Sequence, residues 1–271
     1  MGRLRYFFFF IVLSASSALF AQVGITVSPG RVYYHLPPGS STSERIVVSN
    51  PTDGELEIGV SISDWCYDSV GNNIGYEART LKTSCADWVQ VMPGSYFTLR
   101  PREQKTLDLL MQVPAAADTT VPVHTALLYV TQLNHGTATT NTGAAIRVTV
   151  RMGVKLYHSF RMTDEKDVEI KDFADREERT PAHLCKRYLD LQFNNTGKSW
   201  IEGTIKWELF NEQSGQKTKL DPTDFYSLPG DSRLVRKELP GDLKKGKYNA
   251  TAIINYGNKD ELKIAELEFE F

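Results

Sequence analysis

The sequence lacks the features that mark several large functional classes. Its 271 residues include only three cysteines, with no Cys-x-x-Cys motif and no Cys/His cluster, so we expect no metal centre or dithiol redox site. The five histidines are scattered without metal-ligand spacing. After the N-terminal segment, no apolar run approaches the roughly 20 residues that a membrane-spanning helix needs. The protein is therefore not expected to be membrane-embedded, and no cofactor is expected.

Catalytic signatures and a strong charge bias are also missing. We find no GxSxG, P-loop or dinucleotide-binding motif. The acid pair Glu177-Glu178 lies in a run of charges, where a solvated face is a better interpretation than a glycosidase dyad. Basic and acidic residues nearly balance, 31 against 33, which argues against a nucleic-acid partner. The sequence thus predicts neither an enzyme nor a nucleic-acid-binding protein.

The first 21 residues have the layout of a secretory signal peptide. Arg3 and Arg5 precede an apolar run, and small residues follow from Ser14 to Ala18. Cleavage after Ala18 or after Ala21 fits this layout. Removing the segment leaves 29 basic against 33 acidic residues, a net charge of −4. We expect an exported protein whose mature chain begins near residue 22.

The mature chain is a series of short β-rich runs separated by turn residues, which predicts an all-β fold. The first group fills residues 22–157 and the second fills residues 158–271, so we expect two β-sandwich domains. The charged stretch from Thr163 to Arg179 is expected to be a solvated edge or loop. The expected strands are 24–27, 31–35, 44–49, 56–64, 88–92, 104–113 and 123–132, then 188–193, 201–210, 232–239, 246–256 and 261–271.

A long run with strict alternation stands at the end of the first group. Residues 144–157 predict one half-buried strand, with one apolar face that consists of Ile146, Val148, Val150, Met152 and Val154. The plain interpretation is a sandwich strand that faces its own core. The alternative is a strand that presents its apolar stripe to a partner.

The cysteines allow one disulfide in an oxidising compartment. Cys66 and Cys85 could close a loop of about 20 residues, worth roughly 3 kcal/mol in the chain-entropy model. Cys185 would then remain as a small buried apolar residue.

Several motifs together resemble the periplasmic pilus-assembly chaperones. The first is Ser28-Pro29-Gly30-Arg31-Val32-Tyr33-Tyr34, and the strand 45–50 ends in Asn50. A Leu-x-Pro-x-Glu turn follows at Leu99-Arg100-Pro101-Arg102-Glu103, and the alternating strand closes with Val154-Lys155-Leu156-Tyr157-His158. In the second half, 191–197 and 227–230 are similar to the family's strand and turn elements. The resemblance covers nearly the whole mature chain.

The resemblance implies two immunoglobulin-like β-sandwich domains in a boomerang arrangement. It also implies a periplasmic chaperone that stabilises pilus or fimbrial subunits by donating a β-strand, for delivery to an outer-membrane usher. By this resemblance, Arg31 and Lys155 anchor the subunit's C-terminal carboxylate, and Ile146, Val148 and Val150 are donor residues. Thr125 and Ser159 stand where the family has an ion pair between its domains, so another contact must hold the domains together here.

Two other functions fit the sequence. The first is a structural or adhesive exported protein, without chaperone activity, in which the alternating strand is covered by its own sandwich. The second is a sugar-binding surface formed by Trp200, Trp207 and Tyr226, although aromatic residues in sandwich strands usually belong to the core.

Overall fold

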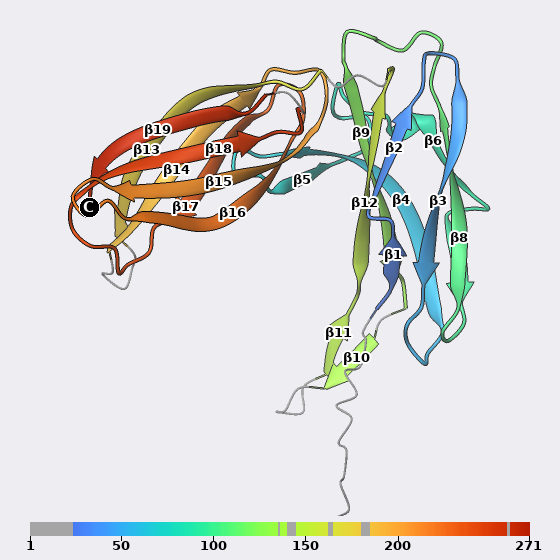
Figure 1. Ribbon diagram of the computed structural model, residues 1–271. Coiled ribbons are helices and arrows are strands. Elements are labelled where there is room, and N and C mark those ends of the chain that lie inside the picture. Colours follow the sequence, from blue (N-terminus) through green and yellow to red (C-terminus); the bar gives the residue numbers. More distant parts are fainter. Residues whose placement is uncertain (1–23, 135, 140–144, 162–164, 180–184, 259–260) are drawn as a thin grey trace, which may run out of the picture.

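The computed structural model describes residues 24–134, 136–139, 145–161, 165–179, 185–258 and 261–271, with the side chains of 136–139 and 145–147 left out. The expected signal peptide, residues 1–21, lies outside this part. Two β-sandwiches form arms that meet at an angle, as Figure 1 shows. This confirms an all-β fold of two immunoglobulin-like domains in a boomerang arrangement. No helix of the described residues is long and apolar enough to cross a membrane.

The N-terminal arm consists of two sheets and one short 3-10 helix, η1 (Ala86–Trp88). The first sheet has the order β1 (Thr26–Ser28), β3 (Ser41–Ser49), β8 (Gln104–Gln112) and β6 (Val89–Met92). The second sheet has the order β2 (Arg31–His35), β12 (Arg151–Ser159), β9 (Val123–Gln132), β4 (Leu56–Tyr67) and β5 (Asn73–Tyr76). A further strand, β7 (Tyr96–Leu99), pairs with β4.

The C-terminal arm also has two sheets. One has the order β13 (Val168–Arg179), β14 (Cys185–Asn195) and β17 (Ser232–Glu238). The other has the order β16 (Lys217–Ser227), β15 (Ile201–Asn211), β18 (Lys247–Asn255) and β19 (Lys263–Glu270). The described part of the charged stretch includes β13, which pairs with β14 alone and is therefore an edge strand, as expected.

Each arm has its own apolar core, and a third cluster lies where the arms meet. In β15, buried and more exposed residues alternate, so Ile205, Trp207 and Leu209 enter the C-terminal core. The third cluster joins Trp65, Tyr67 and Tyr157 of the N-terminal arm to Leu228, with Trp200 and Tyr226 packed against it. We call this third cluster the junction cluster.

The predicted single strand over residues 144–157 is wrong, because the structure divides it. β12 begins at Arg151, whereas β11 (Ala145–Val148) pairs with β10 (Gly136–Thr139) in a separate hairpin. Figure 1 shows this hairpin extending past the end of the N-terminal arm. The break lies at Thr149 and Val150. The Val150 carbonyl still accepts a hydrogen bond from the Gln132 amide at 2.9 Å, and beyond it the chain leaves the sheet.

Candidate functional site

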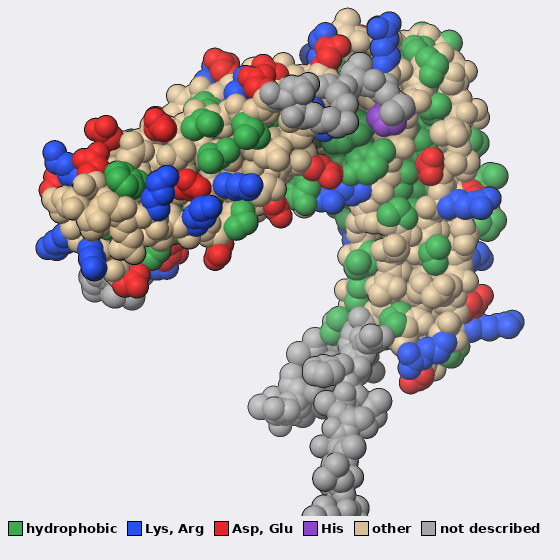
Figure 2. Space-filling view, viewed as in Figure 1, with side chains coloured by type: hydrophobic (Ala, Val, Ile, Leu, Met, Phe, Trp, Pro, Cys, Tyr) green, Lys and Arg blue, Asp and Glu red, His purple; other side chains and the backbone are tan. Residues whose placement is uncertain are grey.

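Arg31 and Lys155 lie side by side on the face of the sheet that meets the C-terminal arm. β2 and β12 run parallel, and the register pairs Lys155 with Arg31. The Lys155 amide donates to the Gly30 carbonyl at 3.0 Å, which holds the two strands together at this point. The two cations come from positions 124 residues apart in the sequence, so the parallel pairing alone makes them neighbours. Figure 2 shows apolar side chains and Lys or Arg side chains at the inner corner between the arms.

Two aromatic rings of β4 hold the Lys155 ammonium. Its Nζ lies 4.2 Å from the centre of the Trp65 ring and 4.4 Å from that of Tyr67. It also donates a hydrogen bond to the Tyr67 hydroxyl at 2.9 Å. Trp65 is fully buried, and its Nε1 donates to the Ala126 carbonyl at 3.0 Å, so its ring has a fixed orientation. The lysine is therefore positioned by cation–π contacts and one neutral acceptor.

The surroundings of Lys155 disfavour the protonated, positively charged form of its side chain. Burial and then the positive charge of Arg31 lower the pKa of Lys155 to about 8, while Glu202 acts in the opposite direction. Among the described residues, no carboxylate lies within ion-pair distance of the Lys155 ammonium. A half-buried cation without an anionic partner gains from binding an incoming carboxylate, which supplies the missing charge.

Arg31 also keeps unused hydrogen-bonding capacity. Its guanidinium lies over the Tyr226 ring, 4.4 Å from the centre, and its Nε is 3.8 Å from a Glu202 carboxylate oxygen. That distance is too long for a hydrogen bond, and Nε is buried without an acceptor. Arg31 and Lys155 together form the paired cationic site that we call the anchor site.

Aromatic stacking and one carboxylate connect the two arms beside the anchor site. The Tyr33 ring stacks on Tyr157 and on Trp200 of the C-terminal arm, with ring centres 5.2 and 5.3 Å apart. The Tyr33 hydroxyl donates to Glu202 at 2.6 Å. These contacts stand in place of an ion pair at Thr125 and Ser159, both of which are buried in the N-terminal arm.

A second link between the arms comes from the turn after β4. The Arg233 guanidinium donates to the Asp68 carbonyl at 2.6 Å, and the Leu234 amide donates to the Ser69 carbonyl at 2.7 Å. Arg233 is only 3% exposed, so protein groups rather than water surround its charged guanidinium. The turn that follows β4 is thus bonded to β17 of the other arm. We call this contact the turn link.

The donor residues do not all lie in the same surroundings. Val150 is half-buried and packs against the N-terminal core, and Val148 is half-buried in β11. The side chain of Ile146 lies outside the described part, although its backbone belongs to β11. Met152 and Val154 face the N-terminal core, so the C-terminal part of the predicted apolar stripe is covered by the N-terminal sandwich.

The structure has no disulfide between Cys66 and Cys85, the pair that was expected to form one. Both are free thiols; Cys85 is fully buried in the N-terminal core, whereas Cys66 is half-buried on β4, opposite Ile74 of β5. Cys185 was expected to be buried, but it is exposed at the start of β14. Its exposure follows from its pairing with Arg179 at the end of the edge strand β13.

The predicted sugar-binding surface is also wrong. Trp207 is 1% exposed inside the C-terminal core, and its Nε1 donates to the Thr223 hydroxyl at 3.0 Å. Trp200 and Tyr226 instead belong to the junction cluster. The three aromatic residues therefore do not form one platform.

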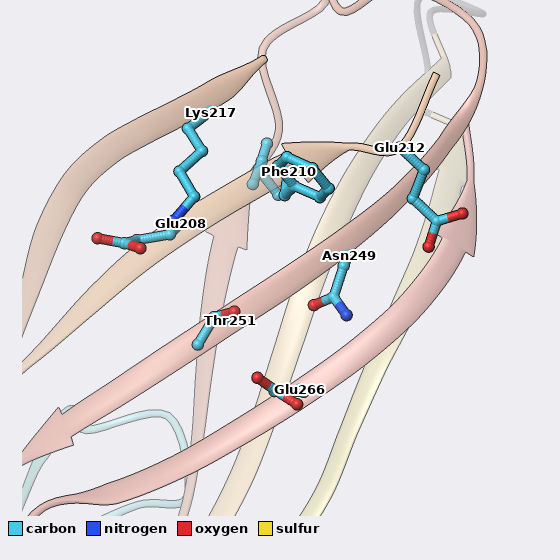
Figure 3. Close-up of a pocket in the computed structure, with 8 residues that line it drawn as sticks. Glu208, Phe210, Glu212, Lys217, Asn249, Thr251 and Glu266 are labelled. Atoms are coloured by element: carbon cyan, nitrogen blue, oxygen red, sulfur yellow. The ribbon is translucent and has the colours of Figure 1, made fainter. Parts of the chain in front are cut away.

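A separate groove lies on the outer face of the C-terminal arm. It has a volume of about 340 Å³ and runs over β15, β18 and β19, with Glu208, Phe210 and Glu266 among its lining residues (Figure 3). Across the described part of the chain, no three His, Cys, Asp or Glu residues form a group that could hold a metal ion. The anchor site is therefore the stronger candidate.

Sequence reasoning missed the residues that surround the anchor site. Trp65, Tyr67, Trp200 and Glu202 were not predicted to contact Arg31 or Lys155. A partial signal was present for β4, because Trp65 and Tyr67 alternate with polar residues at the end of a strand and so share one face. No signal in the sequence places Glu202 beside Arg31.

Comparisons with known proteins give matches to solved structures alone. No protein-family model matches the chain, and no curated protein matches it. A structure from the work "Chaperone-tip adhesin complex is vital for synergistic activation of CFA/I fimbriae biogenesis" is 11% identical and has a TM-score of 0.46; the match covers 90% of this chain and 98% of that one.

Two further solved structures also match most of the chain at low sequence identity. The CsuC–CsuE chaperone–tip adhesion subunit pre-assembly complex from archaic chaperone-usher Csu pili of Acinetobacter baumannii is 11% identical, with a TM-score of 0.47 and coverage of 90% and 97%. The E. coli chaperone DraB is 18% identical, with a TM-score of 0.43 and coverage of 90% and 98%. Fimbrial chaperones are thus among the solved structures to which the chain is similar.

Proposed function

We propose that the protein is an exported, non-enzymatic chaperone of the periplasm that holds pilus or fimbrial subunits. The anchor site binds the C-terminal carboxylate of the subunit, and the neighbouring strand pairs with the subunit's exposed backbone. Residues 22–157 form the strand-donating domain and residues 158–271 form the second domain. An outer-membrane usher is the proposed acceptor of the loaded subunit.

One observation carries this proposal: the Lys155 ammonium is held in a defined position and has no carboxylate partner in the described part of the chain. Two aromatic rings orient it, and Arg31 lies beside it with a buried Nε that lacks an acceptor. An incoming carboxylate would satisfy both cations through charge-assisted hydrogen bonds. A buried lysine kept only for stability would instead be expected to have an internal anionic partner.

The backbone next to the anchor site supports strand pairing. The register of β2 with β12 begins at Lys155, whereas β9 pairs with β12 from Arg151 onward. Within the described residues, no strand pairs with residues 151–154 on the side opposite β9. Free backbone groups at a sheet edge favour the addition of another strand. Ile146 and Val148 of the adjoining strand β11 are also proposed donors, with Val150 at the border of the covered core.

The proposal is tested by affinity capture of the tagged mature protein from the periplasm, followed by mass spectrometry. Wild type is compared with Arg31→Ala and Lys155→Ala, and Lys217→Ala on the exposed end of β16 is the matched control. We expect small β-rich exported subunits with the wild type and the control, and a loss of at least about tenfold with the two anchor variants. Equal recovery by all four proteins, each shown to be folded, would contradict the anchor assignment.

A further inference from the structure

A third cation lies on the same face of β12 as Lys155. Arg151 precedes Lys155 by four residues, so both side chains leave the strand on the same face, about 13 Å apart along it. The Arg151 guanidinium lies over the Tyr129 ring, 3.5 Å from the centre. Tyr129 packs against the junction cluster, which places Arg151 on the face that meets the C-terminal arm. Unlike Lys155, Arg151 is exposed.

A glycine lies beside the Tyr129 ring that Arg151 covers. Gly153 stands directly opposite Tyr129 in the register of β12 with β9. A Cβ at this position would lie 3.2 Å from Leu127 Cδ1 and 3.7 Å from Tyr129 Cε1, so the glycine lets these two side chains lie close to β12. A cation–π contact of this kind orients the guanidinium but leaves its hydrogen-bond donors free in the plane of the group.

No internal anion uses these donors in the described part of the chain. The residues across the sheet from Arg151 and Gly153 are Thr131, Gly59, Tyr129 and Ser61, none of which is acidic. The positions across from Lys155 are Leu127 and Ser63, which are also uncharged. Arg151 forms no ion pair with a described residue. This face of the N-terminal arm therefore offers two separated positive charges along one strand and no negative charge between them.

The direction of a bound subunit follows from the anchor site, so this step rests on the proposed function. A chain whose C-terminal carboxylate lies at Lys155 and which pairs with the open edge of residues 151–154 must run parallel to β12. Because Arg31 of β2 occupies the edge opposite Lys155, the last residue of the bound chain lies opposite Val154, and its carboxylate points on toward Lys155. The residue three positions earlier then lies opposite Arg151. Residues that lie opposite each other in parallel strands project to the same face, so this side chain shares the face of Arg151.

We propose that Arg151 selects subunits that carry an acidic side chain three residues before their C-terminus. The anchor site recognises the terminal carboxylate, which every protein chain has, and gives little discrimination among subunits. Arg151 reads a side chain at a fixed distance from that terminus and thereby adds specificity. The partner class is thus a C-terminal β-strand with a free carboxylate and a Glu or Asp at this position.

Synthetic strand-forming peptides of alternating Val and Thr provide the probe. One peptide has Glu three residues before its C-terminus, a second has Lys there, and a third has Glu four residues before the end, on the opposite face. A fourth repeats the first with an amidated C-terminus. Binding to the mature protein is measured by fluorescence anisotropy. We expect the first peptide to bind about two- to fivefold more tightly than the second and third. Arg151→Glu should reverse the preference between the first and second peptides.

The outcomes separate this inference from the proposed function. Equal binding of the three free-acid peptides, with loss of binding by the amidated one, would overturn the role of Arg151 and leave the anchor site in place. Equal binding of the amidated peptide, or no binding of any peptide, would contradict the anchor site and the role of Arg151 with it. An Arg151→Leu variant that keeps the wild-type preference would also overturn the inference. Thermal unfolding of each variant confirms that it is folded.

Discussion

Subunit binding should weaken above pH 8, because the anchor lysine loses its proton at an unusually low pH. The pKa of Lys155 is lowered to about 8 by burial and by Arg31. The protonated fraction then falls from about 0.9 at pH 7 to about 0.03 at pH 9.5, whereas a lysine with an ordinary pKa would stay about nine-tenths protonated. If only the ammonium form binds a carboxylate, the affinity decreases on the order of thirtyfold, or about 2 kcal/mol.

Three tyrosines beside Lys155 stay neutral over this range. Burial raises the pKa values of Tyr33, Tyr67 and Tyr157 above the ordinary tyrosine value, so these rings stay neutral at pH 9.5. Arg31 keeps its charge throughout. The pH dependence of carboxylate binding therefore reports mainly on Lys155.

The assay is a titration of a free-acid peptide against the mature protein at intervals from pH 7 to pH 9.5. Lys155→Arg is the matched variant, because a guanidinium stays protonated at these values, and its affinity should change little with pH. A wild-type affinity that is constant over this range, together with loss of binding in Lys155→Ala, would refute the reasoning. It would mean that the lysine contributes packing rather than charge.

Three further predictions concern neighbouring groups. Lys155→Met should raise the free energy of unfolding by about 1–2 kcal/mol while abolishing carboxylate binding, because it removes a half-buried charge; lower stability in urea denaturation would count against this. Glu202→Gln should tighten carboxylate binding about two- to threefold, since it removes the anion nearest Arg31; an unchanged peptide affinity would contradict it. Burial lowers the pKa of His124 to about 4, below the unfolded value near 6.5. The unfolded state therefore binds more protons between these values, and stability should fall by about 2 kcal/mol from pH 7 to pH 5. His124→Phe, which can keep the contact with Trp88, should reduce this loss.

β2 and β15 were predictable because buried and more exposed residues alternate along them. β2 matches the expected range 31–35, and β15 extends one residue beyond its expected end. β9 also matches its expected range 123–132, although residues 123–128 are all buried. The prediction of one strand over residues 144–157 was wrong, although apolar and polar residues alternate along it. Apolar alternation fixes which face a residue occupies, but it cannot show that the chain leaves the sheet at Val150 to pair with β10.

The candidate site was predictable in its cations and unpredictable in its surroundings. Arg31 and Lys155 were singled out through short motifs that resemble a known family. The rings of Trp65 and Tyr67 reach Lys155 from a strand about 90 residues away, and Glu202 reaches Arg31 from the other arm. Such contacts depend on strand order and on the angle between the arms, neither of which local sequence periodicity encodes.

The turn link gives β4 a mechanical role. One strand carries the rings that hold the anchor lysine, and the turn at its end is bonded to the C-terminal arm through Arg233 and Leu234. A change in the angle of that arm is therefore transmitted through the turn link to β4, whose aromatic rings surround the Lys155 ammonium. Thermodynamic linkage makes such coupling reciprocal: a cargo that favours one arm angle is held more tightly when another partner imposes that angle, and is released when a partner imposes a different one. Under the proposed function, loading and unloading of a subunit are therefore coupled to the angle of the C-terminal arm.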